Sequence, residues 1–317
     1  RCVGRGRARA TRGVIPPRIL VTGANGLVGQ ALVRAAARWP GADVLATGRG
    51  PAVSHASGGY ARLDVLDADA VERTFQDFAP DVVLHAAGEA RVEPCEADRE
   101  GCWAVNVDAV VAMAAACDRH GAKLVLPSTD FVFDGKAGPY AETDRPAPIN
   151  AYGRSKLAAE NALRMSRLDD WAVARTTLVY GAPAGDGRLD LVRWVLRELS
   201  AGRPTRVVSD QTRTPTYDDD LADGILRIVR FDRRGVFHLS GREHLPVIDV
   251  AHQVAESFGL DKRLISPAPT ADLHPGAPRP LDGGLLILRA ESELGYRPRP
   301  LADALAALRQ RLAVQAG

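Results

Sequence analysis

The sequence has little lysine, no strong net charge and no long apolar run. Of its 41 basic residues, only four are lysines, and the formal net charge is +2. A charge this small creates no overall field that would attract the chain to nucleic acid or to a membrane surface. No continuous apolar stretch approaches the ~20 residues that a helix needs to span a bilayer. We therefore expect neither nucleic acid nor a membrane as a partner.

Cysteine and histidine are also sparse and lack the spacings of metal or disulfide motifs. The four cysteines are Cys2, Cys95, Cys102 and Cys117, with no CxxC pair, and the seven histidines include no HExxH. A chain of 317 residues can build a core without a disulfide framework. We expect reduced thiols, no metal and a cytoplasmic location.

The first seventeen residues differ from the rest of the sequence. They carry five arginines, no acid and no apolar segment of the kind found in secretory signals. We interpret 1–17 as a disordered tail, with an RNA- or phosphate-binding arm as the alternative. The whole chain, at 46% hydrophobic and 25% charged residues, has the composition of an ordinary globular protein.

Short apolar segments alternate with segments of helical period in the first half of the chain. Strands followed by helices in this way indicate a parallel sheet covered on both faces, a Rossmann-type doubly wound α/β fold. We expect this NAD(P)-binding domain over 18–181 and a smaller substrate-binding lobe over 182–317, interleaved with the sheet. The expected strands are 18–22, 42–49, 61–67, 81–88, 122–129 and 171–181, and the main expected helices are 71–79, 106–121, 155–167, 190–202, 218–230, 247–260 and 301–313.

A glycine-rich turn follows the first expected strand. The segment "TGANGLVG" places Gly23, Gly26 and Gly29 between that strand and a helix. These glycines permit a tight turn, a close approach of backbone to a pyrophosphate, and close packing of helix on sheet. A phosphate then lies against free N–H groups at the helix N-terminus, where the dipole favours negative charge. The turn predicts a dinucleotide site.

The segment "NAYGRSK" places Tyr152 and Lys156 four residues apart, on one face of an expected helix. A tyrosine, with a usual pKa of ~10, is a poor acid near neutral pH. A neighbouring ammonium lowers such a pKa, so the phenol can protonate a carbonyl oxygen that receives hydride. Ser128 and Thr129, at the end of the fifth strand, offer a hydroxyl to polarise that oxygen. We predict that this group reduces a ketone.

The GxxGxxG spacing resembles that of the extended short-chain dehydrogenase/reductases. The second strand ends in "TGRG", with Arg49 and no acid, which favours the 2′-phosphate of NADPH; NADH is the alternative. The resemblance implies that "LDV" lies against the adenine, that "HAAG" passes under the cofactor and that Asn106 is a structural asparagine. The expected cofactor-binding residues are Gly23, Asn25, Gly26, Leu27, Val28, Gly29, Arg49, Asp64, Val65, Ala86, Ala87, Gly88, Asn106, Tyr152 and Lys156.

The segment from 128 to 160, "STDFVFDGKAGPYAETDRPAPINAYGRSKLAAE", resembles the dTDP-4-dehydrorhamnose reductases. A second segment, "DQTRTPTYDDDLA" over 210–222, resembles the same family, and the likeness extends over about 18–310. It implies NAD(P)H-dependent reduction of the C4 ketone of a nucleotide-linked deoxysugar. It places Thr129, Tyr152 and Lys156 in the catalytic positions, with Ser128 as the alternative hydroxyl. It also suggests a homodimer.

Two departures from that family pattern fall where the sugar is expected. Phe131 replaces the tyrosine of the family's STDY, and Arg213 replaces the glycine of its DQxGxPT. The hydroxyl lost at Phe131 could have faced the sugar, and Arg213 either binds phosphate or points into solvent. The expected substrate-binding residues are Phe131, Gln211, Arg213 and Thr216.

Two other functions remain open from the sequence. The same segment resembles the β regulatory subunit of methionine adenosyltransferase, which would bind NADP(H) without turnover. A nucleotide-sugar epimerase or dehydratase is the other alternative. Dehydratases of this type usually carry an acidic pair after the strand-five hydroxyl, whereas Asp130 here is followed by Phe131.

Overall fold

The main feature of the computed structural model, which describes residues 16–52, 59–185 and 189–316, is a seven-stranded parallel sheet. Its strand order is β11-β6-β5-β4-β1-β2-β3, so the direction of winding reverses between β1 and β4. A reversal of this kind opens a crevice at the carboxyl ends of the strands, where ligands bind. The predicted doubly wound fold is confirmed. The strands are β1 (Arg18–Thr22), β2 (Asp43–Gly48), β3 (Tyr60–Arg62), β4 (Val82–His85), β5 (Lys123–Thr129), β6 (Trp171–Thr176) and β11 (Gly235–His238).

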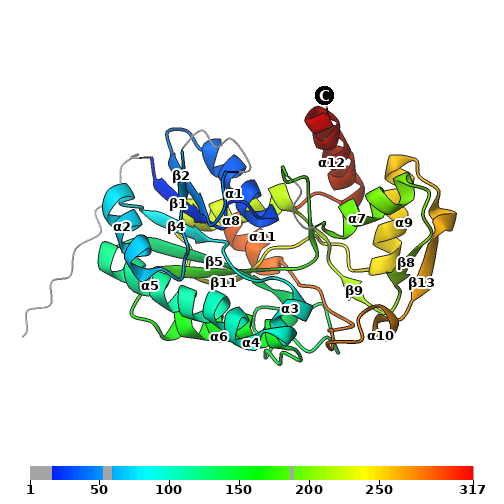
Figure 1. Cartoon of the computed structure of the whole chain (residues 1–317), viewed down its shortest axis with the longest axis horizontal. Helices are drawn as coiled ribbons and strands as arrows, with labels where there is room; N and C mark the ends of the chain where they lie inside the picture. Colours follow the sequence, from blue (N-terminus) through cyan, green and yellow to red (C-terminus); the bar gives the residue numbers. More distant parts are fainter. Residues whose placement is uncertain (1–15, 53–58, 186–188, 317) are drawn as a thin grey trace, which may run out of the picture.

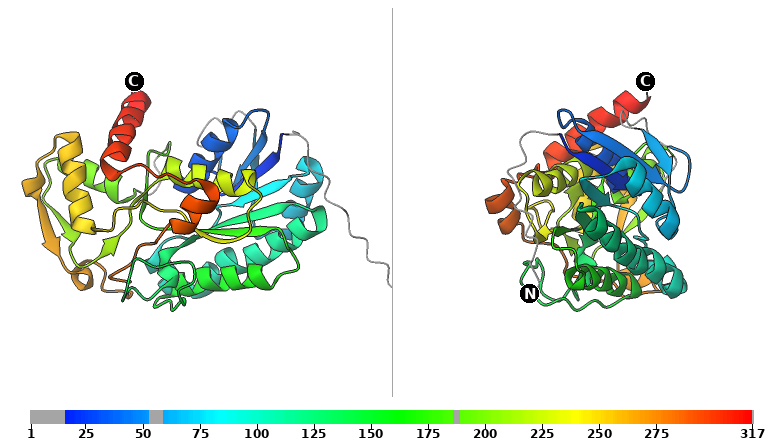
Figure 2. Two further views of the ribbon diagram at one scale, coloured as in Figure 1. Left: turned by 180° about the vertical axis from the view of Figure 1, so that it is seen from behind. Right: turned by 90° about the vertical axis from the view of Figure 1, so that its left-hand side faces the viewer.

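Helices cover both faces of this sheet (Figures 1 and 2). Neighbouring strand residues alternate between two buried clusters: Val21 packs with the helices of one face and Leu20 with those of the other. This double burial explains why the strands are apolar along their whole length. One face carries α1 (Leu27–Ala37), α8 (Asp218–Arg230) and α11 (Leu288–Leu294), and the other carries α2 (Ala68–Phe78), α5 (Ala109–His120) and α6 (Ala151–Met165).

Local signals set several element ends. Asp67 caps α2 by accepting the Ala70 N–H, and α5 ends at Gly121 in the left-handed region, as the glycine predicted. The predicted strand 171–181 is wrong at its end, because β6 stops at Thr176. Leu178 has φ of 41°, and the following β7 (Val179–Tyr180) pairs with β10 (Thr216–Tyr217). This break leads the chain from the sheet into the smaller lobe.

One helical run among the described residues is long and apolar enough to cross a membrane by length and composition. It extends over Arg99–His120 and combines α4 (Arg99–Trp103), the π-helical turn η1 (Ala104–Asp108) and α5. Half of it is buried, because α5 contributes Val110 and Met113 to the core cluster under the sheet. Core packing therefore accounts for the buried half of its apolar residues.

The second half of the sequence builds a smaller lobe and also returns to the large sheet (Figure 1). The lobe has its own apolar cluster, between its helices and a parallel pair of strands. In contrast, α8, β11 and α11 pack on the large sheet. The lobe elements are α7 (Leu191–Ser200), β8 (Thr205–Val208), β9 (Thr212–Arg213), β12 (Leu245–Pro246), α9 (Val247–Phe258), η3 (Lys262–Leu264), β13 (Ile265–Ala268), α10 (Thr270–Leu273) and α12 (Leu301–Ala316).

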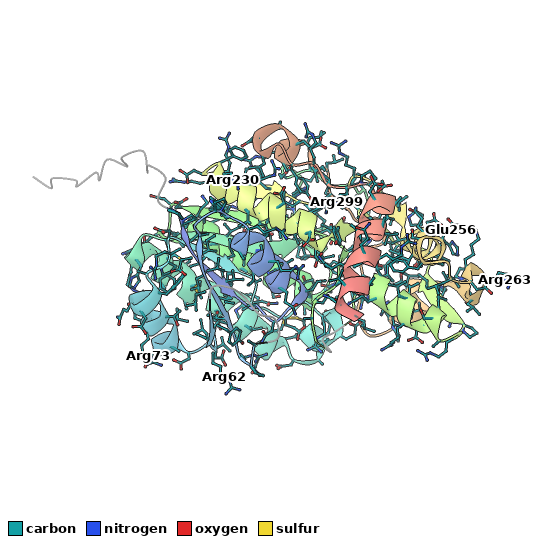
Figure 3. The ribbon with its side chains drawn as sticks, turned by 90° about the horizontal axis from the view of Figure 1, so that it is seen from above. Arg62, Arg73, Arg230, Glu256, Arg263 and Arg299 are labelled. Carbon is teal, nitrogen blue, oxygen red and sulfur yellow. A yellow bond between two sulfur atoms is a disulfide. The ribbon has the colours of Figure 1, made fainter. Side chains whose placement is uncertain are left out.

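The arginines labelled in Figure 3 are spread over the molecule. Several have acidic partners close by: Arg263 pairs with Asp261 and Arg299 with Asp220. This arrangement agrees with the small net charge. The predicted tail, 1–17, lies outside the described residues apart from its last two prolines.

Candidate active site

The glycine turn joins β1 to α1 at the point where the winding reverses. Gly23 has φ of +66°, and a Cβ there would lie 2.6 Å from the Ala86 backbone. A Cβ on Gly29 would lie 2.1 Å from the Gly23 carbonyl oxygen, so packing requires glycine at both positions. A Cβ on Gly26 would lie 3.4 Å from the Gly23 carbonyl oxygen, an ordinary contact, so packing within the chain does not explain that glycine. Gly26 also begins α1 without a side-chain cap, which leaves N–H groups for an anion.

The loop after β4 lies against this turn and contains Ala86, Ala87 and Gly88. Asn106, buried in η1, holds the loop from behind: its Oδ1 accepts the Glu89 N–H at 2.8 Å, and its Nδ2 donates to the Glu89 carbonyl oxygen at 3.0 Å. The structural asparagine implied by the sequence therefore fixes backbone at the crevice.

The end of β2 carries the residue expected to choose the cofactor. Arg49 is exposed and makes no ion pair with any residue within 16–52, 59–185 or 189–316. Beside it, Asn25 donates from Nδ2 to the Pro51 carbonyl oxygen at 2.9 Å and to the Tyr60 hydroxyl at 3.1 Å. Asn25 thus braces the loop after β2. Of the adenine-side residues, Asp64 is exposed just beyond β3 and Val65 is buried.

Helix α6 places Tyr152 in its first turn and Lys156 in the next. Asn150 caps the helix by accepting the Gly153 N–H at 2.8 Å. Tyr152 is buried, and its ring lies edge-on to the Phe131 ring with centroids 5.7 Å apart. Lys156 donates from Nζ to the Pro127 carbonyl oxygen at 2.8 Å. Burial lowers the pKa of Lys156 to about 8, against the opposing effect of the Glu160 carboxylate.

The two candidate hydroxyls at the end of β5 have different surroundings. Ser128 is buried and donates from Oγ to Glu160 Oε1 at 2.5 Å. Thr129 projects from the opposite face of the strand, and its Oγ1 accepts the Phe131 N–H at 3.2 Å. The Ser128 proton is thus committed to Glu160 in a short hydrogen bond, whereas Thr129 Oγ1 donates to Asp130 Oδ1 at the longer distance of 3.3 Å.

Known proteins resemble this chain over most of its length. The profile of the RmlD substrate binding domain family matches residues 17–314. The chain belongs to this family. It is 36% identical over 292 residues to a probable low-salt glycan biosynthesis reductase of Haloferax volcanii, covering 91% of this chain and 96% of that one. It is also 36% identical over 269 residues to a dTDP-4-dehydrorhamnose reductase of Mycobacterium tuberculosis, covering 83% and 82%. The crystal structure of a dTDP-4-dehydrorhamnose reductase from Clostridium acetobutylicum superimposes with a TM-score of 0.81 at 28% identity, covering 93% and 99%.

The residues of this RmlD-family chain that were expected to bind substrate are mostly held by protein contacts. Gln211 donates from Nε2 to Thr270 Oγ1 at 2.9 Å, and Thr216 donates from Oγ1 to the Thr177 carbonyl oxygen at 2.7 Å. Arg213 is only 2% exposed, so the alternative that it points into solvent is wrong. Phe131 contacts Tyr152 directly, ring against ring.

The prediction of reduced thiols is wrong for one pair of cysteines. A disulfide joins Cys95 in α3 (Val92–Ala97) to Cys102 in α4, with Cα atoms 5.1 Å apart. The seven-residue separation matches no motif, and only the packing of two short helices brings these residues together. Both sulfurs share an apolar cluster with Tyr152. Cys117 is a free, buried thiol whose pKa is raised by burial.

Two buried polar residues near the site were not singled out from the sequence of the RmlD-family chain. His85, at the end of β4, shares a hydrogen bond between Nδ1 and Thr22 Oγ1 at 2.9 Å, and burial lowers its pKa to about 3. Glu160, one turn beyond Lys156, pairs with Arg175 at 2.7 Å. The sequence did contain a sign of this pair, because Glu160 occupies a position on the apolar face of its helix. An acid at such a position is rarely buried unless it has a partner.

Proposed function

We propose that this RmlD-family chain is an NADPH-dependent reductase of the C4 ketone of a nucleotide-linked deoxysugar. The observation that carries the proposal is the placement of Tyr152 and Lys156 on consecutive turns of α6, beside the end of β5. The glycine turn lies at the same edge of the sheet. The two curated relatives described above are named as reductases, one of them as a dTDP-4-dehydrorhamnose reductase.

The glycine turn fits a dinucleotide. The unexplained glycine at Gly26 and the uncapped start of α1 suit a pyrophosphate, with Leu27 and Val28 supplying N–H groups. The guanidinium of Arg49, which is exposed and has no ion-pair partner in the part of the chain that the structure describes, suits the 2′-phosphate, and this is the reason to prefer NADPH over NADH. When bound, the nicotinamide supplies hydride to the carbonyl carbon. Asp64, Val65 and the 86–88 loop complete the proposed cofactor site.

Each reacting side chain has a defined task in this proposal. Tyr152 donates its phenolic proton to the substrate carbonyl oxygen as that oxygen gains charge. Thr129 donates a hydrogen bond to the same oxygen. We assign this task to Thr129 because the Ser128 hydroxyl makes a short, buried hydrogen bond of 2.5 Å to Glu160, whereas the hydrogen bond that Thr129 Oγ1 donates to Asp130 Oδ1 is longer, at 3.3 Å. Lys156, held by the Pro127 carbonyl oxygen, places a positive charge one turn from the phenol.

The test is a spectrophotometric assay of the whole chain. The protein is mixed with NADPH and a panel of 4-keto nucleotide sugars that differ in base and in sugar stereochemistry, and the absorbance of the reduced nicotinamide is followed. Net oxidation that depends on one sugar supports the reductase. Equal traces with and without every sugar would overturn it.

The remaining outcomes identify the two alternatives. Tight NADPH binding without oxidation across the panel indicates a regulatory module of the methionine adenosyltransferase β type. Conversion of a sugar without net change in the nicotinamide indicates an epimerase. The retained pair of Tyr152 and Lys156 favours turnover, since a binding module has no need of a proton donor.

We extend the proposal to the domain roles, the assembly and the location. Residues 18–181 bind the dinucleotide and 182–317 supply the substrate lobe, interleaved with the sheet through α8, β11 and α11. The chain acts in the cytoplasm. The chain forms a homodimer through the outer side of α4, α5 and α6, where Trp103 is 47%, Val111 50% and Met165 86% exposed. Light scattering coupled to gel filtration measures the mass, and Val111→Glu should shift a dimer toward monomer.

A further inference from the structure

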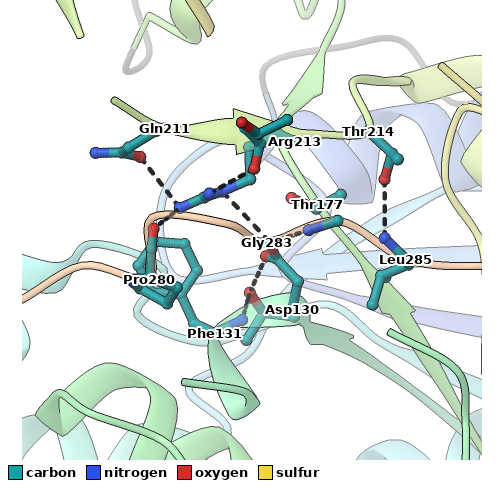
Figure 4. A network of polar contacts seen from close by, with 12 residues as sticks. Asp130, Phe131, Thr177, Gln211, Arg213, Thr214, Pro280, Gly283 and Leu285 are labelled. Atoms are coloured by element: carbon teal, nitrogen blue, oxygen red, sulfur yellow. Dashed lines mark hydrogen bonds and ion pairs between the residues drawn. The ribbon is translucent and has the colours of Figure 1, made fainter. Parts of the chain in front are cut away.

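Arg213 is buried at the junction between the lobe and the large sheet, and each of its three side-chain nitrogens has a protein partner. Nη1 donates to the carbonyl oxygens of Thr212 at 2.7 Å and Leu281 at 3.0 Å, and Nη2 donates to those of Pro280 at 2.5 Å and to Gln211 Oε1 at 3.1 Å. Figure 4 shows these contacts converging on the guanidinium. A side chain with its donors engaged in this way has none left for a phosphate.

The third nitrogen joins two parts of the chain. Arg213 Nε lies 3.4 Å from Asp130 Oδ2, and Asp130 directly follows the end of β5. The loop from the lobe is shaped to fit between them: a Cβ on Gly283 would lie 2.8 Å from Asp130 Oδ2 and 2.9 Å from Arg213 Nη1. The Gly284 N–H also points to Asp130 Oδ2 at 3.3 Å. The pair therefore locks lobe and sheet together at the strand that carries Thr129.

The guanidinium also covers an aromatic ring that contacts the proposed proton donor. Arg213 Cζ lies 5.6 Å from the centroid of the Phe131 ring, and the Phe131 ring meets the Tyr152 ring edge-on at 5.7 Å. Cation–π and edge-to-face contacts each favour one relative orientation of their members. The three side chains form a continuous stack from the lobe to α6.

We propose that Arg213 is a positioning residue, which holds the Tyr152 phenol in its reactive orientation through the Phe131 ring. The proposal rests on the proton-donor role of Tyr152 in the proposed function. Arg213 is fixed on both sides, by Asp130 and by the 280–283 loop, so the ring beneath it has little freedom. A phenol held in this way reaches the carbonyl oxygen without reorganisation, which is the condition for rapid proton transfer.

The first test needs no substrate. The protein is labelled with 13C in its six tyrosines, and the Tyr152 ring signal is assigned by its loss in Tyr152→Phe. Arg213→Met and Phe131→Leu should both move this signal, because each breaks the stack, whereas Phe131→Tyr should leave it near its place. Arg299→Met is the matched control. Arg299 also combines an ion pair, with Asp220 of α8 at 2.5 Å, and a ring contact, with Tyr217 at 5.3 Å, but it lies outside this stack.

The second test uses turnover of the sugar found by the panel assay. Arg213→Met and Phe131→Leu should each lower kcat by about tenfold to a hundredfold, while KM for NADPH stays within about twofold. The double variant should lose no more than the larger single loss, because both changes break the same stack. Arg299→Met should keep the kcat of the unmodified chain.

Arg213→Met leaves the Asp130 carboxylate buried and unpaired, which can prevent folding. The variant that combines Asp130→Asn with Arg213→Met removes both charges. It should move the Tyr152 signal and lower kcat as Arg213→Met does. An unmoved Tyr152 signal in this folded variant, or a raised sugar KM with unchanged kcat, would overturn the proposal and point to a substrate contact. If the unmodified chain reduces no sugar, the proposed function fails, while the tyrosine signal still decides whether Arg213 orders Tyr152.

Discussion

Ser128 and Thr129 stand next to each other at the end of β5, yet they belong to two different environments. Ser128 joins what we call the structural side, where it donates to Glu160 and Glu160 pairs with Arg175, all of them buried. Thr129 joins the reaction side, with Phe131 and Tyr152. One strand end thus supplies a closed polar network on one face and reacting groups on the other. The two sides should respond to substitution with different observables, stability for one and turnover for the other.

Glu160→Gln tests the structural side and should have the largest effect. The change leaves the Arg175 guanidinium buried without its carboxylate, and breaking a buried pair costs about 3 kcal/mol or more in the free energy of unfolding. Urea unfolding measures this loss. Asp223→Asn, which breaks an exposed pair with Arg227, is the control and should cost about 0.5 kcal/mol or less. Equal losses in the two variants would show that the buried network does not hold the fold.

Tyr152→Phe tests the reaction side. Without the phenolic proton, kcat should fall on the order of a hundredfold or more, with NADPH affinity nearly unchanged. Stopped-flow oxidation of NADPH and a fluorescence titration measure the two quantities. Tyr296→Phe is the control, because the Tyr296 hydroxyl is buried without a hydrogen-bond partner among the described residues. Turnover preserved in Tyr152→Phe would mean that another group donates the proton.

Thr129→Val and Ser128→Ala compare the two sides at neighbouring positions of the same strand. Thr129→Val removes the proposed donor to the carbonyl oxygen and should lower kcat about tenfold or more. It also removes the hydrogen bond that Thr129 accepts from the Phe131 N–H, which should cost about 1 kcal/mol of stability. Ser128→Ala removes one hydrogen bond to Glu160 and should cost about 1 kcal/mol of stability, with kcat within about twofold. Kinetics and urea unfolding of both variants give the answer. The opposite pattern would assign the polarising hydroxyl to Ser128.

The reaction side could be predicted from sequence because its residues are close in the chain or lie at strand ends. Tyr152 and Lys156 are four residues apart on one helix, and the glycine turn follows directly from β1. Parallel strands bring their carboxyl ends to one edge, so an ordered list of strands already places these motifs together. The doubly wound fold and the cofactor turn followed from this short-range information.

The structural side and the lobe junction could not be predicted in this way, because their contacts join distant segments. Ser128 meets Glu160 across 32 residues, and Arg213 meets Pro280 across 67. The periodicity of a sequence does not predict which buried acid forms an ion pair with which arginine. Arg213 was therefore expected to contact a ligand or solvent. The Cys95–Cys102 disulfide was missed for a related reason: the distance between the two cysteines depends on how two short helices pack against each other.

Lys156 connects the two sides, because it lies one turn from Tyr152 and one turn from Glu160. Burial lowers the pKa of Lys156 to about 8, and the Glu160 carboxylate acts in the opposite direction. The proposed mechanism needs the charged ammonium, so kcat/KM should be retained below this pH and fall as the pH rises through about 8. A pH profile of kcat/KM from about 6 to about 10 measures this limb.

Glu160→Gln should move that alkaline limb to lower pH, because removing a nearby negative charge lowers the pKa of an ammonium further. Ser128→Ala keeps the carboxylate and should leave the limb nearly in place, so the two variants separate the charge of Glu160 from the packing around it. If the alkaline limb of kcat/KM stays in place in Glu160→Gln, the structural side has no electrostatic influence on the reacting groups. Its role would then be limited to stabilising the fold.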